Sequence, residues 1–128
     1  MRVLLDTHAL LWWLAGDERL SEAARSWIGD EASDVLVSAA SAWEIATKVR
    51  IGKLPGAAAV VSELGQHILD QGFAELAITV GHGQRAGLLP GPHKDPFDRM
   101  LAAQAQAENL PIVSNDPVFD HYGVRRLW

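Results

Sequence analysis

The sequence predicts an α/β fold of three layers (α/β/α), in which helices cover both faces of a mainly parallel sheet of about four to five strands. Short continuous apolar runs, typical of strands buried on both faces, recur along the chain. Segments with helical spacing separate these runs, which favours right-handed crossovers between parallel strands. With 128 residues, 48 % of them hydrophobic, the chain has the size of a single domain spanning residues 1–128.

Each predicted element follows from a local pattern. Val3-Leu4-Leu5 is an apolar run that predicts the first strand, and helices are expected over 9–15 and 21–29, the second with Ser21 as its N-cap. Asp95-Pro96 predicts a helix start, with an N-cap followed by Pro at the first helical position, so we assign Asp95 a structural role. The other elements are expected as strand 35–38, a helix ending near Gly52, helix 57–70, strand 73–78, a short helix 80–88, a helix from Asp95-Pro96 to about Glu108, and strands 111–114 and 124–127.

The composition narrows the function classes. The chain has no cysteine, which excludes a disulfide framework, a zinc–thiolate site and a cysteine nucleophile. That composition suits a reducing cytoplasm, where we expect the protein. The apolar stretch at the start of the chain is interrupted at Asp6 and His8 and is too short to span a bilayer, so no membrane partner is expected.

The net charge and the distribution of basic residues indicate whether the protein could bind a nucleic acid. A formal net charge of −5 argues weakly against one, because phosphate contacts usually require clustered Lys and Arg. Basic residues are nevertheless concentrated in two segments, where they form either a local positive rim able to guide phosphates or ordinary solvated surface. They are Lys48, Arg50, Lys53, Lys94 and Arg99.

Four acids, Asp6, Glu44, Asp98 and Asp116, lie near the ends of predicted strands or the starts of predicted helices, and each has an ordinary structural explanation. Asp6 could cap the first helix, and Asp98 could favour the dipole at its helix N-terminus. Glu44 could complete a capping box or pair with Lys48 four residues on. Asp116 could start a turn.

These four acids share one location in the predicted fold, because the carboxyl ends of parallel strands lie along one edge of a sheet, where ligands bind. Two unit charges about 4 Å apart repel by about 4 kcal/mol at an effective dielectric near 20, so a cation must offset the clustering. Oxygen-only ligands indicate a hard cation, Mg²⁺ or Mn²⁺. Such a site can polarise a phosphodiester and lower the pKa of a bound water, and its positive charge would attract a substrate phosphate.

Four motifs together resemble the PIN-domain ribonucleases, and more narrowly the VapC toxins of bacterial type II toxin–antitoxin pairs. The order of the motifs is similar from about Val3 to Phe119. The motifs are Leu4-Leu5-Asp6-Thr7-His8-Ala9-Leu10, Ser41-Ala42-Trp43-Glu44-Ile45, His93-Lys94-Asp95-Pro96-Phe97-Asp98-Arg99-Met100-Leu101 and Ser114-Asn115-Asp116-Pro117.

The resemblance implies a PIN-like domain acting as a magnesium-dependent endoribonuclease, in which a metal-activated water hydrolyses RNA. It implies that Asp6 and Asp98 are the principal metal ligands and that Glu44 and Asp116 complete the acidic site. Thr7 would place a hydroxyl beside the metal, or cap the first helix instead. The resemblance further implies a homodimer and a cognate antitoxin that occludes the site.

Two other functions remain open at this stage. An aspartate-nucleophile phosphatase also carries an acid after its first strand, but it needs a second acid two residues later, where this chain has His8. A non-catalytic PIN-like domain that binds only a partner protein would use the acids as helix caps. Neutralising an acid would then lower the melting temperature of the metal-free protein, whereas in a crowded metal site it would raise it or leave it unchanged.

Overall fold

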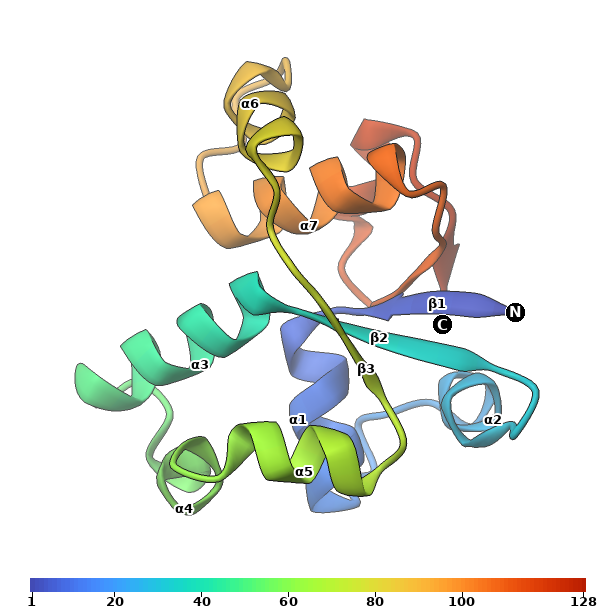
Figure 1. Ribbon diagram of the computed structural model, residues 1–128, viewed down its shortest axis with the longest axis vertical. Helices are drawn as coiled ribbons and strands as arrows, with labels where there is room; N and C mark the ends of the chain where they lie inside the picture. Colours follow the sequence, from blue (N-terminus) through green and yellow to red (C-terminus); the bar gives the residue numbers. More distant parts are fainter.

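All five strands of the sheet run parallel, with helices on both sides (Figure 1). The computed structural model describes residues 1–128. The strand order β3-β2-β1-β4-β5 places the first strand at the centre of the sheet. The strands are β1 (Arg2–Leu5), β2 (Asp34–Ser38), β3 (Ala74–Leu76), β4 (Ile112–Val113) and β5 (Arg126–Leu127). The predicted three-layer fold with a mainly parallel sheet of four to five strands is confirmed.

The helices alternate with the strands along the chain. Three N-caps follow local sequence rules: Ser21 accepts from the backbone N–H of Ala24, Asp95 accepts from those of Phe97 and Asp98, and Asp6 accepts from that of Thr7. The helices are α1 (Thr7–Ala15), α2 (Glu22–Gly29), α3 (Ala39–Arg50), α4 (Ala58–Val61), α5 (Leu64–Asp70), α6 (Val80–Leu88) and α7 (Pro96–Ala107), with the 3-10 helices η1 (Pro55–Ala57) and η2 (Pro117–Tyr122).

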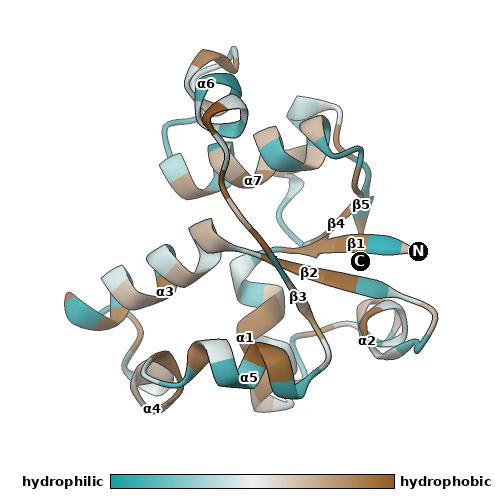
Figure 2. Cartoon of the chain, viewed as in Figure 1, coloured by the Kyte–Doolittle hydropathy of each residue, from teal (hydrophilic) through white to brown (hydrophobic).

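The sheet separates two hydrophobic clusters. Side chains alternate along β1, so that Val3 and Leu5 belong to one cluster and Leu4 to the other, and all three are fully buried. Helices α1, α2 and α5 pack on one side of the sheet and α7 on the other (Figure 1). Figure 2 shows β1 and β2 hydrophobic along most of their length, with a hydrophilic residue near the start of each.

One predicted helix, spanning 57–70, is wrong as a single element. The chain forms η1, α4 and α5 there, and Glu63 between the two α-helices has φ −118° and ψ 23°, outside the helical region. The β-branched Val60 and Val61, followed by Ser62, have low helix propensity, which explains the break. The apolar stripe of this segment still packs on the core.

No helix in the structure combines the length and the apolar character needed to cross a bilayer.

Candidate functional site

The parallel sheet brings the ends of β1, β2 and β4 to one edge. Asp6 directly follows β1 and Ser114 directly follows β4, while β2 ends at Ser38, the N-cap of α3. Helix α7 connects to the start of β4, so it runs opposite to the strands. Its first turn, which carries Asp98, therefore lies at the carboxyl edge of the sheet. The topology therefore gathers three of the four predicted acids from α3, α7 and the end of β1.

Asp6 is buried and fixed through both of its carboxylate oxygens. Oδ1 accepts the backbone N–H of Thr7 at 2.7 Å, and Oδ2 accepts the hydroxyl of Ser114 at 2.6 Å. Burial raises the pKa of Asp6, the hydrogen bond from Ser114 offsets part of that rise, and the charge of Glu44 adds to it. Asp6 thus caps α1, and its burial makes the ionised form of the carboxylate less favourable than in water.

Glu44 is buried on α3 and forms an ion pair with Lys48, one turn further along the helix. This contact is the i, i+4 pairing predicted from the sequence. Burial lowers the pKa of Lys48, but Glu44, Asp95 and Asp98 together outweigh burial and leave the pKa raised. Lys48 therefore neutralises part of the acidic charge at this edge.

Asp98 lies in the first turn of α7, and its Oδ2 is 2.9 Å from Nε2 of His93. Burial raises the pKa of Asp98 to about 6; the contact with His93 offsets part of the rise, and the charges of Asp95, Asp6 and Glu44 add to it. The charges of Asp6 and Glu44 both raise the pKa of Asp98, and the charge of Glu44 raises the pKa of Asp6, which is consistent with the three acids lying near one another.

Asp116 is not among the charges that shift the pKa of Asp6 or Asp98. Its carboxylate caps η2 by accepting the backbone N–H of Val118 at 3.0 Å, so the predicted role as a turn starter is confirmed. Its own N–H donates to Oγ of Ser114, the hydroxyl that also donates to Asp6. Ser114 therefore links Asp116 to the other acids, a contact that the sequence analysis did not identify.

The donor set of this edge suits a hard cation, because the acids supply oxygen, and burial together with the charges of neighbouring acids raises the pKa of Asp6 and Asp98. In the conformation present, no three Asp, Glu or His side chains converge closely enough to hold one ion together. Glu44 and Asp98 contact Lys48 and His93 instead, and both would have to turn toward Asp6 to share an ion with it. The metal-binding role of the four acids stays a prediction.

Thr7 caps no helix. Its hydroxyl donates to Oγ of Ser41 at 2.9 Å in a buried contact, while the cap of α1 is Asp6, so the alternative of Thr7 as a cap is wrong. The Thr7–Ser41 contact ties α1 to α3 and fixes the spacing between Asp6 and Glu44.

Arg99 serves the fold, a role that neither alternative from the sequence, a phosphate-guiding rim or ordinary solvated surface, included. Its guanidinium donates to four backbone carbonyls, which tie the end of α6 and the following loop to α7. The acceptors are the carbonyl oxygens of Ala86, Gly87, Leu89 and His93. The planar guanidinium has five N–H donors and can therefore bind several carbonyls at once. Backbone acceptors cannot be predicted from side-chain patterns in the sequence. Arg99 holds the segment that carries His93, the partner of Asp98.

Replacing Arg99 by alanine is expected to lower the free energy of unfolding by about 2–4 kcal/mol, because several carbonyls lose a charged donor. Lysine should not restore the loss, since an ammonium cannot reproduce the planar fork. Urea unfolding at neutral pH measures both variants. Arg85→Ala is the matched control, because Arg85 is exposed and makes one 3.4 Å contact with Gln106. Equal losses for Arg99→Ala and Arg85→Ala would contradict the prediction.

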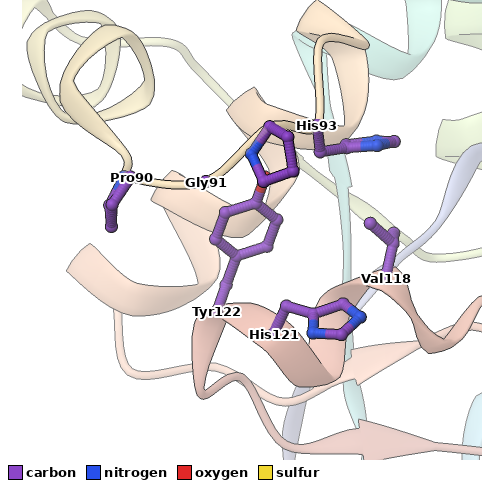
Figure 3. A pocket seen from close by; sticks show the side chains of 7 residues that line it. Pro90, Gly91, His93, Val118, His121 and Tyr122 are labelled. Carbon is purple, nitrogen blue, oxygen red and sulfur yellow. The ribbon is translucent and has the colours of Figure 1, made fainter.

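A hollow of about 650 Å³ adjoins the acids on the side of His93. Figure 3 shows the side chains of Pro90 and His93 on one wall and those of Val118, His121 and Tyr122, all from η2, on the other. Pro92 and Gly91 complete the lining. None of the four acids lines this hollow, but His93 lines it and also contacts Asp98.

The fold and the site define a class: a small parallel α/β domain with acids gathered at the carboxyl edge of the sheet. The PIN domain family profile matches residues 3–124. Ribonuclease VapC22 of Mycobacterium tuberculosis is 34 % identical over 115 residues, which cover 89 % of this chain and 86 % of that protein.

Two solved structures share the fold. A VapBC2 complex from Rickettsia felis, bound to a DNA fragment from its promoter, contains a chain with a TM-score of 0.67 and 15 % identity, covering all of both chains. A toxin–antitoxin complex from Klebsiella pneumoniae contains one with a TM-score of 0.57 and 15 % identity, covering 91 % of this chain and 88 % of the other. The chain belongs to the PIN-domain family, and within it to the VapC type.

Proposed function

We propose that this protein is an Mg²⁺-dependent endoribonuclease that acts as the toxin of a type II toxin–antitoxin pair in the cytoplasm. The observation that carries the proposal is the shared electrostatic environment of Asp6, Glu44 and Asp98 at the carboxyl edge of a PIN-family sheet. The name of the relative VapC22, a ribonuclease, supports RNA as the substrate class.

In this proposal Asp6 and Asp98 hold Mg²⁺, for which Mn²⁺ could substitute, and Glu44 and Asp116 complete the acidic site. A bound divalent cation would supply Lewis acidity at the phosphodiester and lower the pKa of an attacking water. Asp6 is preorganised for binding, because the Thr7 N–H and the Ser114 hydroxyl fix its orientation. Without metal, Lys48 and His93 contact Glu44 and Asp98, and these contacts would be released if the two acids turned toward a cation.

The proposal includes two protein partners: a cognate antitoxin that covers the acidic edge, and a second copy of the chain in a homodimer. The titles of the similar structures, a VapBC2 complex and a toxin–antitoxin complex, support an antitoxin. The antitoxin would keep RNA away from Asp6 and Asp98 until it is removed.

Cleavage of purified total RNA tests the proposed activity directly. We expect discrete fragments when the isolated protein acts with Mg²⁺ and intact RNA when EDTA is present, because the acids alone supply no Lewis acid. Denaturing gel electrophoresis resolves the products. A heat-inactivated preparation controls for contaminating nucleases. Equal cleavage with Mg²⁺ and with EDTA would refute metal dependence, and intact RNA in both would refute the activity.

A non-catalytic partner-binding domain is the second candidate, and one set of contacts favours it. Asp6 and Asp116 both cap helices, Glu44 pairs with Lys48 and Asp98 contacts His93, so each of the four acids has a structural partner. A phosphatase with Asp6 as the nucleophile is disfavoured, because His8 stands where such an enzyme needs its second acid. The behaviour of the metal-free protein with pH separates the first two candidates and is treated in the Discussion.

A further inference from the structure

Trp43 is the one strongly exposed tryptophan of the five in the chain. Its side chain and backbone are together 60 % exposed, whereas the other four tryptophans are partly buried and pack against the core. Trp43 contacts Phe97 with ring centroids 4.8 Å apart and an interplanar angle of 75°, an edge-to-face pair. Core packing therefore accounts for the other tryptophans but leaves most of Trp43 in water.

The ring pair is built on the two helices that carry acids of the proposed site. Trp43 directly precedes Glu44 on α3, and Phe97 directly precedes Asp98 on α7. Helices α3 and α7 contact each other, and the ring pair spans that α3–α7 junction one residue before each acid. A strand whose phosphate reached the acids would have its neighbouring bases within reach of Trp43.

A cation lies at the same junction. Lys48 is partly buried, and the charges of Glu44, Asp95 and Asp98 all raise its pKa. Proteins that bind single-stranded nucleic acid combine cations that follow the backbone with aromatic rings on which bases stack. Acids, a lysine and an exposed ring pair at one junction match that combination.

We propose that Trp43, supported edge-on by Phe97, is a stacking subsite for an unpaired RNA base next to the phosphodiester held at the acids. This inference rests on the proposed ribonuclease function and names the form of its substrate: single-stranded RNA. Duplex RNA keeps its bases stacked inside the helix and offers none to the indole.

Binding of a short fluorescein-labelled single-stranded RNA of mixed sequence tests the subsite by fluorescence anisotropy, with Ca²⁺ in place of Mg²⁺. We expect Trp43→Ala to weaken binding by about 5- to 100-fold, the range of a single base–aromatic stack. Trp43→Phe should retain most of the affinity, because it keeps an aromatic face. The melting temperature should stay unchanged in both variants, since Trp43 is largely exposed.

Leu69→Ala is the matched control, because Leu69 is an exposed apolar residue, 68 % exposed, on α5 rather than at the α3–α7 junction. It should bind RNA as the wild type does. The intrinsic tryptophan fluorescence of the wild type should fall when RNA is added, and that fall should be largely lost in Trp43→Phe. With Mg²⁺, Trp43→Ala should raise KM for the same RNA more than it lowers kcat.

The outcomes separate the subsite from the proposed function. Equal RNA affinity of wild type and Trp43→Ala, together with Mg²⁺-dependent cleavage by both, would overturn the subsite and leave the ribonuclease standing; the ring pair would then be a surface for protein contacts. A wild type that neither binds nor cleaves RNA would overturn the function itself. Equal affinity for a duplex of the same sequence would overturn the assignment to single strands.

Discussion

Replacing Asp6 by asparagine is expected to lower Mg²⁺-dependent RNA cleavage by at least about 100-fold, because the loss of a charged metal ligand should cost more than the 10- to 100-fold typical of an outer-shell partner. Asparagine is as good an N-cap as aspartate, so α1 should still begin at the same residue. Initial rates on one RNA at saturating Mg²⁺, together with the circular dichroism spectrum, measure the two effects separately.

Asp34→Asn is the control for this substitution. Asp34 is an exposed aspartate at the start of β2, at the opposite edge of the same sheet. The same charge change there should leave the cleavage rate within about twofold, because exposed substitutions away from a site have small effects. If Asp6→Asn cleaved RNA as fast as Asp34→Asn, Asp6 would hold no essential metal.

Replacing Asp98 by asparagine is expected to stabilise the metal-free protein above pH 6. The pKa of Asp98 is about 6 in the folded protein against 3.8 for an unperturbed group, so the folded state holds a proton that the unfolded chain has already lost. Above pH 6 the ionised Asp98 therefore lowers the free energy of unfolding by up to about 3 kcal/mol, at about 1.4 kcal/mol per pKa unit. Below about pH 4 both states are protonated and the cost disappears.

The effect of Asp98 on stability develops between about pH 4 and pH 6, between its unperturbed pKa and its pKa in the folded protein. Wild-type stability should fall as the pH rises from about 4 to about 6, whereas Asp98→Asn should lack this part of the decline. The gain should amount to several degrees in melting temperature at pH 7 and vanish near pH 4. Loss of the favourable helix-dipole interaction of Asp98 subtracts about 0.3–1 kcal/mol from it.

Calorimetry in EDTA at pH 4 and pH 7 compares the melting temperatures of the wild type and Asp98→Asn. Repeating it with added Mg²⁺ compares their stabilisation by the metal. Mg²⁺ should stabilise the wild type at pH 7 by mass action but Asp98→Asn much less. A lower melting temperature for Asp98→Asn at pH 7 in EDTA would favour the non-catalytic candidate, in which the acid serves the fold.

The sequence predicted the fold and the placement of three acids at one edge of the sheet because both depend on local patterns. Apolar runs mark buried strands, and parallel strands must end at one edge, which brought Asp6 and Glu44 together. Asp98 joined them because Asp95-Pro96 marked the start of α7. The i, i+4 spacing likewise predicted the partner of Glu44.

The contacts that hold the site are the ones the sequence did not reveal. Ser114 donates a hydrogen bond to Asp6, 108 positions away in the sequence. A single serine after a strand does not indicate which distant residue it will contact. Arg99 looked like a phosphate ligand because cationic side chains suggest anionic partners, whereas its acceptors are backbone carbonyls. The break before α5 depends on weak differences in helix propensity, which tertiary packing easily decides.

The Asp6–Ser114 contact has a consequence for synthesis. Chains fold as they emerge from the ribosome, amino-terminal end first, and β1 emerges long before its neighbour β4 has been translated. Asp6 therefore has neither Ser114 nor Asp98 beside it until the segment through β4 has left the exit tunnel. Until that point a translating ribosome carries this polypeptide with its acidic edge unassembled.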